Sequence, residues 1–283
     1  MARNFGCPCT SNPHPSLIET AMKKLLAVFF FSSLLASAAA QPPRCERHFF
    51  HKTAPEVTRK ALQSNTVALC FEAFAVLHSG VSRTPLWSAE YLTRDSLKAA
   101  REIPRADSFH AEPALPPGQG AELADYVRSG FDRGHMAPAA DMPTAQAQHE
   151  SFSLANVVPQ NRKNNQILWS AIEGATRHLT NLRGELYVIT GPVFEGDKLD
   201  RINGRVLVPT HVFKAVLDPV KSEAAAWLAP NNDSGDYQVM SIDALERRVG
   251  FNLFPKLPEA AKQRAMELPE PRIRSRNSDS KLQ

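Results

Sequence analysis

The stretch Phe131-Asp132-Arg133-Gly134-His135-Met136-Ala137-Pro138 decides which fold we expect of this chain. Acidic, basic and imidazole side chains fall within four residues, and a glycine directly precedes the histidine. Pro138 can continue neither a helix nor a central strand, and Gly134 allows backbone geometry that other residues resist. The stretch therefore predicts the end of a strand that enters a constrained loop. His135 would be held at a fixed place, where an imidazole suits general-base chemistry.

A second stretch begins with Asn156-Val-Val-Pro-Gln-Asn161, which is rich in proline and asparagine and predicts a loop. A helix should follow this loop, with Asn164 or Asn165 as its N-cap. The helix is predicted by one apolar stripe at helical spacing, formed by Leu168, Ile172, Ala175 and Leu179.

Asn165, Trp169 and Glu173 follow one another at intervals of four along a neighbouring face of this helix. An amide oxygen at the start of the helix and a carboxylate two turns later could point at one hard cation. Such cations take oxygen ligands, and Mg²⁺ in particular keeps several waters and needs few protein ligands. The spacing therefore predicts a magnesium site, with Mn²⁺ as the alternative.

Three segments together resemble the DNA/RNA non-specific endonuclease family of the ββα-metal superfamily: Asp132-Arg-Gly-His-Met-Ala-Pro138, Asn156–Asn161, and Asn164-Asn-Gln-x-x-Trp-x-x-x-Glu173. The resemblance extends more weakly from about residue 45 to about residue 255. It implies an α+β fold with a central antiparallel sheet flanked by helices. The helix of the metal site would begin near Asn165.

The resemblance also implies roles for individual residues. His135 would be the general base, and Arg133 together with Arg105 would neutralise the phosphate oxygens. Asn165 would bind the metal directly and Glu173 through water. The same expected catalytic set includes Asn156, as the residue that ties the loop to the site. The residues expected to be structural are Asp132, Gly134 and Trp169.

The arginine assignment has competitors. Arg105 lies in the segment Arg-Ala-Asp-Ser-Phe109, which resembles the family segment that delivers an arginine to the scissile phosphate. Arg94 and Arg101 lie close enough in the sequence to take that place instead.

The function implied is hydrolysis of phosphodiester bonds in DNA and RNA, with 5′-phosphate products and no base preference, since sequence is read at base edges. Two alternatives stay open. The same site could act on a small or lipid phosphodiester, or the protein could capture nucleic acid at the cell envelope without cleaving it. A homodimer is compatible with the resemblance.

The first forty residues predict an export signal rather than part of the fold. Residues 22–40 combine a basic start, an apolar run from Leu25 to Leu35 and small residues before a cut after Ala40. The run is short for a membrane span, so we expect no stable membrane association after cleavage. Residues 1–21 are interpreted as a spurious extension before the true start at Met22. The resemblance is thus to an exported bacterial type, periplasmic or secreted.

Export bears on the cysteines and on the charge. Cys45 and Cys70 are the only cysteines after the cut, and such a pair in an exported protein predicts a disulfide. The cut reduces 33 basic and 29 acidic residues to 30 and 28, which leaves a net charge of only +2. Attraction to phosphate must therefore be local.

The rest of the chain predicts one nuclease domain over residues 41–255 and a flexible charged tail over residues 256–283. Residues 96–130 are expected to be loop-like, His211 to be structural and residues 241–249 to form a helix. Strands are expected at residues 67–78, 87–92, 185–190, 206–217 and 224–228.

Overall fold

The computed structural model describes residues 45–273. The proposed extension (1–21), the signal peptide (22–40) and the last part of the expected tail (274–283) lie outside the described residues.

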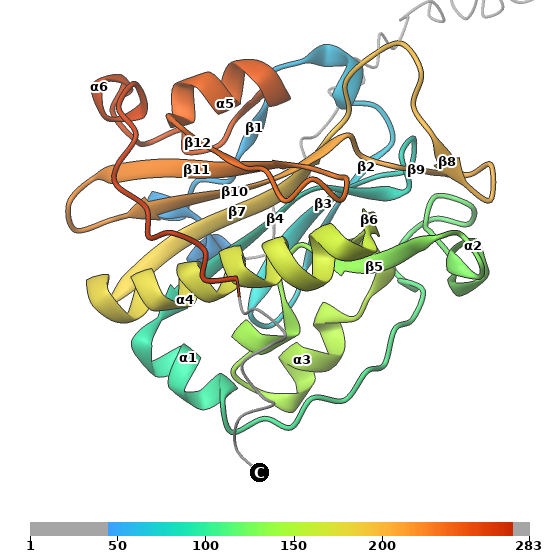
Figure 1. Cartoon of the computed structure of the whole chain (residues 1–283), viewed down its shortest axis with the longest axis horizontal. Helices are drawn as coiled ribbons and strands as arrows, with labels where there is room; N and C mark the ends of the chain where they lie inside the picture. The colour runs from blue at the N-terminus through green and yellow to red at the C-terminus, as the bar shows by residue number, and fades with distance from the viewer. Residues whose placement is uncertain (1–44, 274–283) are drawn as a thin grey trace, which may run out of the picture. The chain divides into compact units, whose positions relative to one another are not determined.

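A seven-stranded antiparallel sheet forms the centre of the fold (Figure 1). Its strands lie in the order β12 (Gln238–Met240), β11 (Glu223–Pro230), β10 (His211–Asp218), β7 (Glu185–Val193), β4 (Thr84–Thr93), β3 (Phe74–Ser79) and β2 (Thr66–Cys70). The central strands are buried along nearly their whole length because helices cover both faces of the sheet. The fold is therefore α+β with a central antiparallel sheet, as the sequence predicts.

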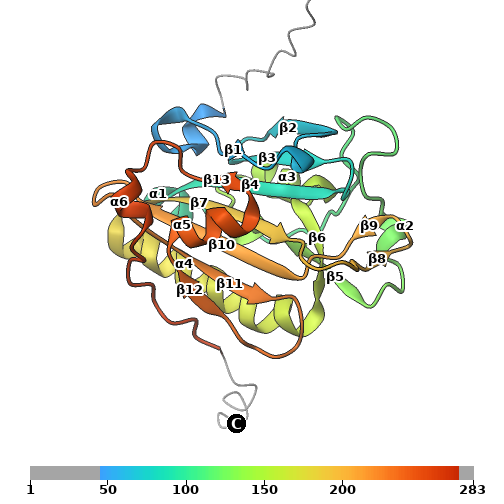
Figure 2. The same ribbon diagram turned by 90° about the horizontal axis from the view of Figure 1, so that it is seen from above.

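Different helices cover the two faces, as Figures 1 and 2 show. On one face, α4 (Ser170–Arg183) packs with α1 (Arg94–Ala100) through a core that includes Leu97, Ile172 and Val188. On the other face, α5 (Ile242–Val249) packs through a second core that includes Trp87 and Phe213. The stripe predicted for the helix lies in the first core: Leu168, Ile172, Ala175 and Leu179.

A smaller unit carries the stretch from Phe131 to Pro138. Strand β5 (Phe131–His135) pairs antiparallel with β6 (Val157–Asn161), so that His135 lies opposite Val157. A π-helical turn, Asn164–Trp169, then leads into α4. Two strands and a helix thus form the ββα unit. The prediction of a loop at residues 156–161 is wrong, because Pro159 is accommodated in a two-stranded pair that leaves one side of each strand unpaired.

The remaining elements are short. They are β1 (Glu56–Val57), β13 (Phe251–Asn252), β8 (Arg201–Ile202), β9 (Val206–Leu207), α2 (Leu123–Tyr126), α3 (Ala145–Ser151) and α6 (Glu259–Lys262), with five 3₁₀ turns among the described residues at Glu46–His48, Phe50–Lys52, Lys60–Leu62, Ala139–Asp141 and Leu154–Asn156.

The segment between β4 and β7 is a closed excursion from the sheet. Strand β4 ends at Thr93 and β7 begins at Glu185, and these two residues are register partners in the sheet. The sequence predicts only loop from 96 to 130, whereas the structure has α1 and α2 there. Thr93 begins α1 with a capping box in which its side chain accepts from the Ser96 backbone.

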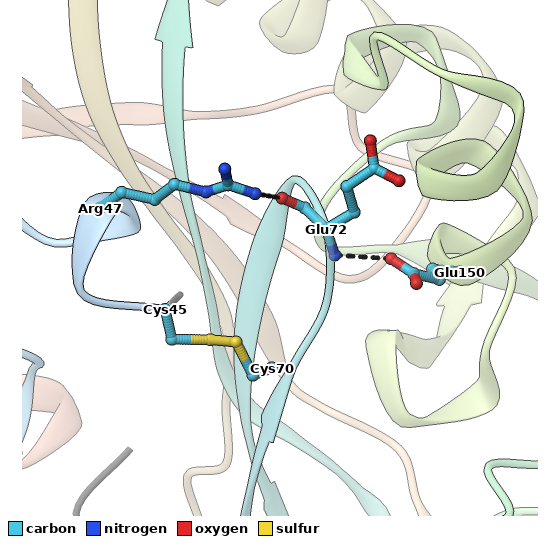
Figure 3. Close-up of a disulfide and its surroundings, with 5 residues drawn as sticks. All are labelled: Cys45, Arg47, Cys70, Glu72 and Glu150. Carbon is cyan, nitrogen blue, oxygen red and sulfur yellow. Dashed lines mark hydrogen bonds between the residues drawn. A yellow bond between two sulfur atoms is a disulfide. The ribbon is translucent and has the colours of Figure 1, made fainter. Parts of the chain in front are cut away.

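Cys45 and Cys70 form the expected disulfide, with their Cα atoms 5.6 Å apart (Figure 3). Arg47 donates to the backbone oxygen of Glu72 in the β2–β3 turn. The Glu72 amide in turn donates to the Glu150 carboxylate on α3 at 2.6 Å. The disulfide therefore fastens the first described turn to a hairpin that is itself held by α3.

The expected tail boundary at residue 256 is wrong for the part of the tail that the structure describes. Leu257, Lys262 and Met266 are all buried, and the Lys262 ammonium contacts the Glu246 carboxylate at 3.1 Å. A backbone bridge joins Ala265 to Ala224 of β11. Apolar residues interspersed among the charges therefore extend the domain through at least Met266.

None of the helices between residues 45 and 273 has the length and apolar character needed to cross a membrane.

Candidate active site

A cleft of about 570 Å³ lies at the outer end of the ββα unit. Strand β5, the π-helical turn and the start of α4 form one side of it, and residues of the long segment before β5 form the other. Its charged and amide-bearing lining residues are Arg105, Asp132, Arg133, His135, Arg162, Asn165, Gln166 and Glu173. The structure therefore brings together residues from three separate parts of the sequence.

His135 stands at the end of β5, where its imidazole forms a cluster of three rings with Phe109 and Phe152. The ring centroids of Phe109 and Phe152 lie 5.0 and 4.9 Å from that of the imidazole. Burial, together with the positive charges of Arg105 and Arg133 and against the charge of Asp107, lowers the pKa of His135 to about 3. Its Nε2 atom is buried and has no hydrogen-bond partner among the described residues. The imidazole is therefore neutral near pH 7, which is the form that can accept a proton.

Gly134 is required for a different reason from the one expected. Its φ is not positive, so backbone freedom is not the cause. A Cβ atom at this position would instead lie 2.0 Å from Oε1 of Gln160 on the paired strand. Glycine is needed because the Gln160 side chain crosses directly over the strand next to the histidine.

Asn156 does not line the cleft, because it is completely buried beneath it. Its amide nitrogen donates to the Ala137 and Ser151 carbonyls at 2.8 and 2.9 Å. Its oxygen accepts from the Ala137 amide at 3.0 Å and from the Ser88 hydroxyl at 2.8 Å. Asn156 thus ties the loop after His135 to strand β4 and is a positioning residue rather than a catalytic one.

Asp132 forms hydrogen bonds with three neighbouring side chains. Its carboxylate accepts from Arg162 at 3.2 Å, from Asn165 at 3.1 Å and from Gln166 at 2.8 Å. The bond to Asn165 uses the amide nitrogen. Asn165 lines the cleft. Its amide oxygen accepts no hydrogen bond from the described part of the chain.

The expected N-cap of the metal-site helix is wrong by three or four residues. The backbone amide of Asn164 donates to Oδ1 of Asn161 at 3.0 Å, so the Asn161 side chain caps the first turn of the helix. Asn164 itself is buried and donates to the Pro230 carbonyl at 2.9 Å. The chain begins the helix with a π turn here, a feature that is frequent at functional sites.

Asn165 and Glu173 fit a cation with oxygen ligands. Both line the cleft, whereas Trp169 between them is 1% exposed and packs in the core, as expected. Burial raises the pKa of Glu173, and the Arg177 and Lys214 charges oppose that rise. Residues 45–273 contain no group of three His, Cys, Asp or Glu side chains that could hold a metal. The donor set is thus one amide oxygen and one carboxylate, which suits Mg²⁺ with bound waters.

Of the three competing arginines, only Arg105 lines the cleft. Its guanidinium is 2.9 Å from the Asp107 carboxylate and 5.3 Å from the centre of the Phe152 ring. Arg94 instead donates to the carbonyls of Asn181 and Leu182 at the end of α4, and Arg101 lines a neighbouring hollow. Arg133 lies over the Phe109 ring at 4.4 Å.

A buried polar cluster behind the cleft was not predicted. Glu90 of β4 is fully buried, and neither of its carboxylate oxygens has a partner among the described residues. Burial and the nearby Asp141 raise its pKa well above the usual range. Arg177 binds Asp141 at 2.8 Å, and Lys214 donates to Thr190 at 2.6 Å. The available signal was one acidic residue within the otherwise uncharged run Thr84–Leu92.

The paired strands, the helix that follows them and the histidine at the cleft define a nuclease of the ββα-metal fold. The model of the DNA/RNA non-specific endonuclease family matches residues 53–260, and the chain belongs to this family. The match confirms the expectation of a hydrolase of this type.

Known relatives agree with this assignment. The chain is 35% identical to Nuclease C1 of Cunninghamella echinulata var. echinulata over 66% of its own length and 82% of the relative's. It is 34% identical to the mitochondrial nuclease of Saccharomyces cerevisiae, over 68% and 66% of the two chains. It is 36% identical to mitochondrial Nuclease EXOG of Danio rerio, over 62% and 57%. The match thus spans less than two thirds of the last two relatives.

A solved structure shares the fold. A chain in the crystal structure of the EndoG/EndoGI complex superposes with a TM-score of 0.61 at 25% identity. The match covers 69% of this chain and 88% of that one.

Proposed function

We propose that this protein is a metal-dependent, sugar-non-specific endonuclease that hydrolyses DNA and RNA and leaves 5′-phosphate ends. One observation carries the proposal. A neutral imidazole, two arginines and an amide–carboxylate pair from separate parts of the sequence line the same cleft. Phosphodiester hydrolysis needs these groups: a base for water, positive charge at the phosphate, and a cation near the leaving oxygen.

His135 is the general base in this proposal. It takes a proton from the attacking water, and its low pKa keeps it unprotonated before the reaction. The imidazole packs against the Phe109 and Phe152 rings, which also contact each other, and Asn156 fixes the chain just beyond it. The imidazole is therefore already fixed in position when the substrate binds, and no ordering of its side chain is needed before it takes the proton from water.

Arg105 and Arg133 bind the non-bridging phosphate oxygens, where charge develops as water attacks. Asn165 and Glu173 would hold Mg²⁺, Asn165 directly and Glu173 through bound waters, and the ion would stabilise the leaving 3′-oxygen. Mn²⁺ could replace it with the same oxygen ligands. Asp132 accepts a hydrogen bond from the amide nitrogen of Asn165, which leaves the amide oxygen for the ion.

The His135→Ala variant tests the reaction class and the base together. Residues 41–283 would be purified and incubated with plasmid DNA and with RNA, each with Mg²⁺ and with a chelator. We expect metal-dependent loss of both polymers, and we expect His135→Ala to lower kcat/KM by roughly 10²–10⁴. Arg94→Ala, which removes an arginine remote from the cleft, is the control.

Other outcomes would each point elsewhere. Cleavage that survives His135→Ala would keep the nuclease and discard the proposed base. Binding without cleavage would favour the capture protein. If neither polymer is bound or cut, the substrate is a small or lipid phosphodiester.

We also propose that the protein is exported, with residues 22–40 as the cleaved signal and the periplasm or the medium as its destination. The support is the signal-like sequence and the Cys45–Cys70 disulfide, which suits an oxidising compartment. N-terminal sequencing of the protein from its native cells should begin at Gln41, and a sequence that retains residues 1–21 would contradict this.

A further inference from the structure

A groove of about 1670 Å³ runs along the exposed side of α4 and joins the cleavage cleft. The two hollows share Arg162, Gln166 and Ser170 as lining residues. The far wall of the groove is the last described part of the chain, Pro269–Ile273. Figure 1 shows this segment crossing α4.

The groove has an open floor. Ser170, Ala171 and Gly174 of α4 line it, and all three have small side chains or none. A Cβ atom added at Gly174 would meet no other atom within 4 Å. A strand of nucleic acid could therefore lie close to the helix without displacing a side chain.

The charge of the groove is predominantly positive. Arg162, Lys163, Arg177 and Arg272 line it, against Asp233 and Glu270. Arg162 and Arg177 are already paired with Asp132 and Asp141. Lys163 and Arg272 are both exposed, and neither forms an ion pair with any residue that the structure describes.

The groove is also longer than one scissile phosphate requires. Arg162 and His178 both line it, and they are separated by about four turns of helix. At 1.5 Å per residue this distance is roughly 24 Å, which corresponds to about seven steps of a duplex at 3.4 Å each. A groove of this length can contact several phosphates of a polymer, whereas a small phosphodiester would occupy only a short part of it.

We propose that this groove binds the phosphate backbone of DNA or RNA beside the cleavage cleft, with Lys163 and Arg272 as the phosphate contacts. The C-terminal segment is then part of the substrate-binding surface. The proposal deepens the nuclease function above and rests on it.

The test compares two double variants in a binding assay without cleavage. Lys163→Gln/Arg272→Gln removes the two unpaired charges of the groove. Lys60→Gln/Lys256→Gln is the matched control, since both lysines are exposed and lie near the core that α5 covers, on the other face of the sheet. Fluorescence anisotropy in the presence of a chelator would give the Kd of a 20-base-pair duplex and of a six-nucleotide strand over a range of salt concentrations.

We expect the groove variant to bind the 20-base-pair duplex about tenfold more weakly at low salt. The slope of log Kd against log salt concentration should fall by about 2, since each lost phosphate contact removes about 0.9. The loss should be smaller for the six-nucleotide strand, which the cleft alone can hold. The control pair should keep the wild-type slope.

An unchanged Kd and slope in the groove variant would overturn the proposal, as would an equal loss in the control pair. These outcomes differ from a failure of the nuclease function. If the nuclease function itself is wrong, the wild-type protein would leave both DNA and RNA uncut in Mg²⁺.

Discussion

The proton affinity of His135 is set by its surroundings rather than by its place in the sequence. Two aromatic rings and the folded chain remove water from the imidazole, and two arginines add positive charge. All of these effects disfavour the protonated form, so the pKa of His135 falls to about 3. The proposed base is therefore unprotonated at neutral pH.

Removal of Arg105 should change both the rate and its pH dependence. The charge of Arg105 lowers the pKa of His135, so Arg105→Ala should move the acid limb of kcat/KM to higher pH. The loss of a phosphate-binding group should also lower kcat/KM by roughly 10². Steady-state assays from about pH 2, below the pKa of His135, to pH 9 would measure both effects.

Two comparison variants separate these effects. Arg105→Lys retains the charge and should restore the position of the acid limb, whereas Arg101→Ala lies outside the cleft and should leave it unchanged. An acid limb that stays in place in Arg105→Ala would show that this arginine does not act on His135.

At this scale the sequence predicts the residues whose chemistry is visible in short motifs. His135, Arg133, Asn165 and Glu173 all line the cleft, as expected. Phe109 and Phe152 were not predicted to pack against the histidine, because aromatic residues in separate segments carry no spacing signal. The reason for Gly134 was also missed, since a contact with Gln160 exists only once β5 and β6 have paired.

Among the elements, the start of the metal-site helix is held by a set of amide side chains. Asn231, which follows β11, accepts from the Asn161 amide at 2.7 Å and donates to the Pro159 carbonyl at 3.0 Å and to the Pro209 carbonyl at 2.9 Å. Gln160 donates to Asn164 at 2.6 Å. These bonds join the ββα unit to the end of the large sheet.

Asn231→Ala should loosen this junction. The substitution leaves the Asn161 backbone amide and the Pro159 and Pro209 carbonyls without their partner. We therefore expect the free energy of unfolding to fall by about 2 kcal/mol. Activity should fall as well, because the π turn that carries Asn165 would lose its support. Urea unfolding and the plasmid assay would measure the two effects. The adjacent, exposed Asn232→Ala should change stability by no more than about 0.5 kcal/mol, and an equal loss there would contradict this role.

The elements of the large sheet could be predicted from the sequence because their apolar, β-branched runs are long. The strand β6 could not, since its stability comes from pairing with β5 and from the amide bonds of Asn231. Proline and asparagine within it favoured a loop by local propensity, and tertiary contacts overrode that preference.

For the whole molecule, buried histidines link stability to pH. Burial and, to a smaller extent, the neighbouring Arg47 lower the pKa of His48 from its usual value of 6.5 to about 4. The unfolded chain therefore binds more protons between these two values. The stabilisation is fully present above pH 6.5 and is lost as the pH falls toward 4.

His48→Gln should flatten this dependence. Between pH 6.5 and pH 4 the wild-type protein should lose roughly 3 kcal/mol more than the variant, at 1.36 kcal/mol for each unit of pKa shift. The raised pKa of Glu246 acts in the opposite direction, so only the difference between the two proteins is informative. Urea unfolding at several pH values would measure it. The exposed His178→Gln should keep the wild-type curve, and a parallel curve for His48→Gln would contradict the assignment.

The limits of the domain were harder to predict than its centre. Composition placed a tail after residue 255, because charged and proline residues dominate there. Lys262 nevertheless becomes buried when the Glu246 carboxylate and the Asn252 side chain meet its ammonium group. Such a contact depends on residues that only the folded chain brings together.

The pairing of Thr93 with Glu185 affects how the sequence of the site can change during evolution. Every residue assigned to the reaction, from Arg105 to Glu173, lies between two chain positions that meet in the sheet. Insertions, deletions and substitutions within this excursion need not change the register of β4 and β7. The length of this excursion can therefore change without altering the sheet, provided that the bonds of Asn156 to Ser88 and of Asn231 to the ββα unit are kept.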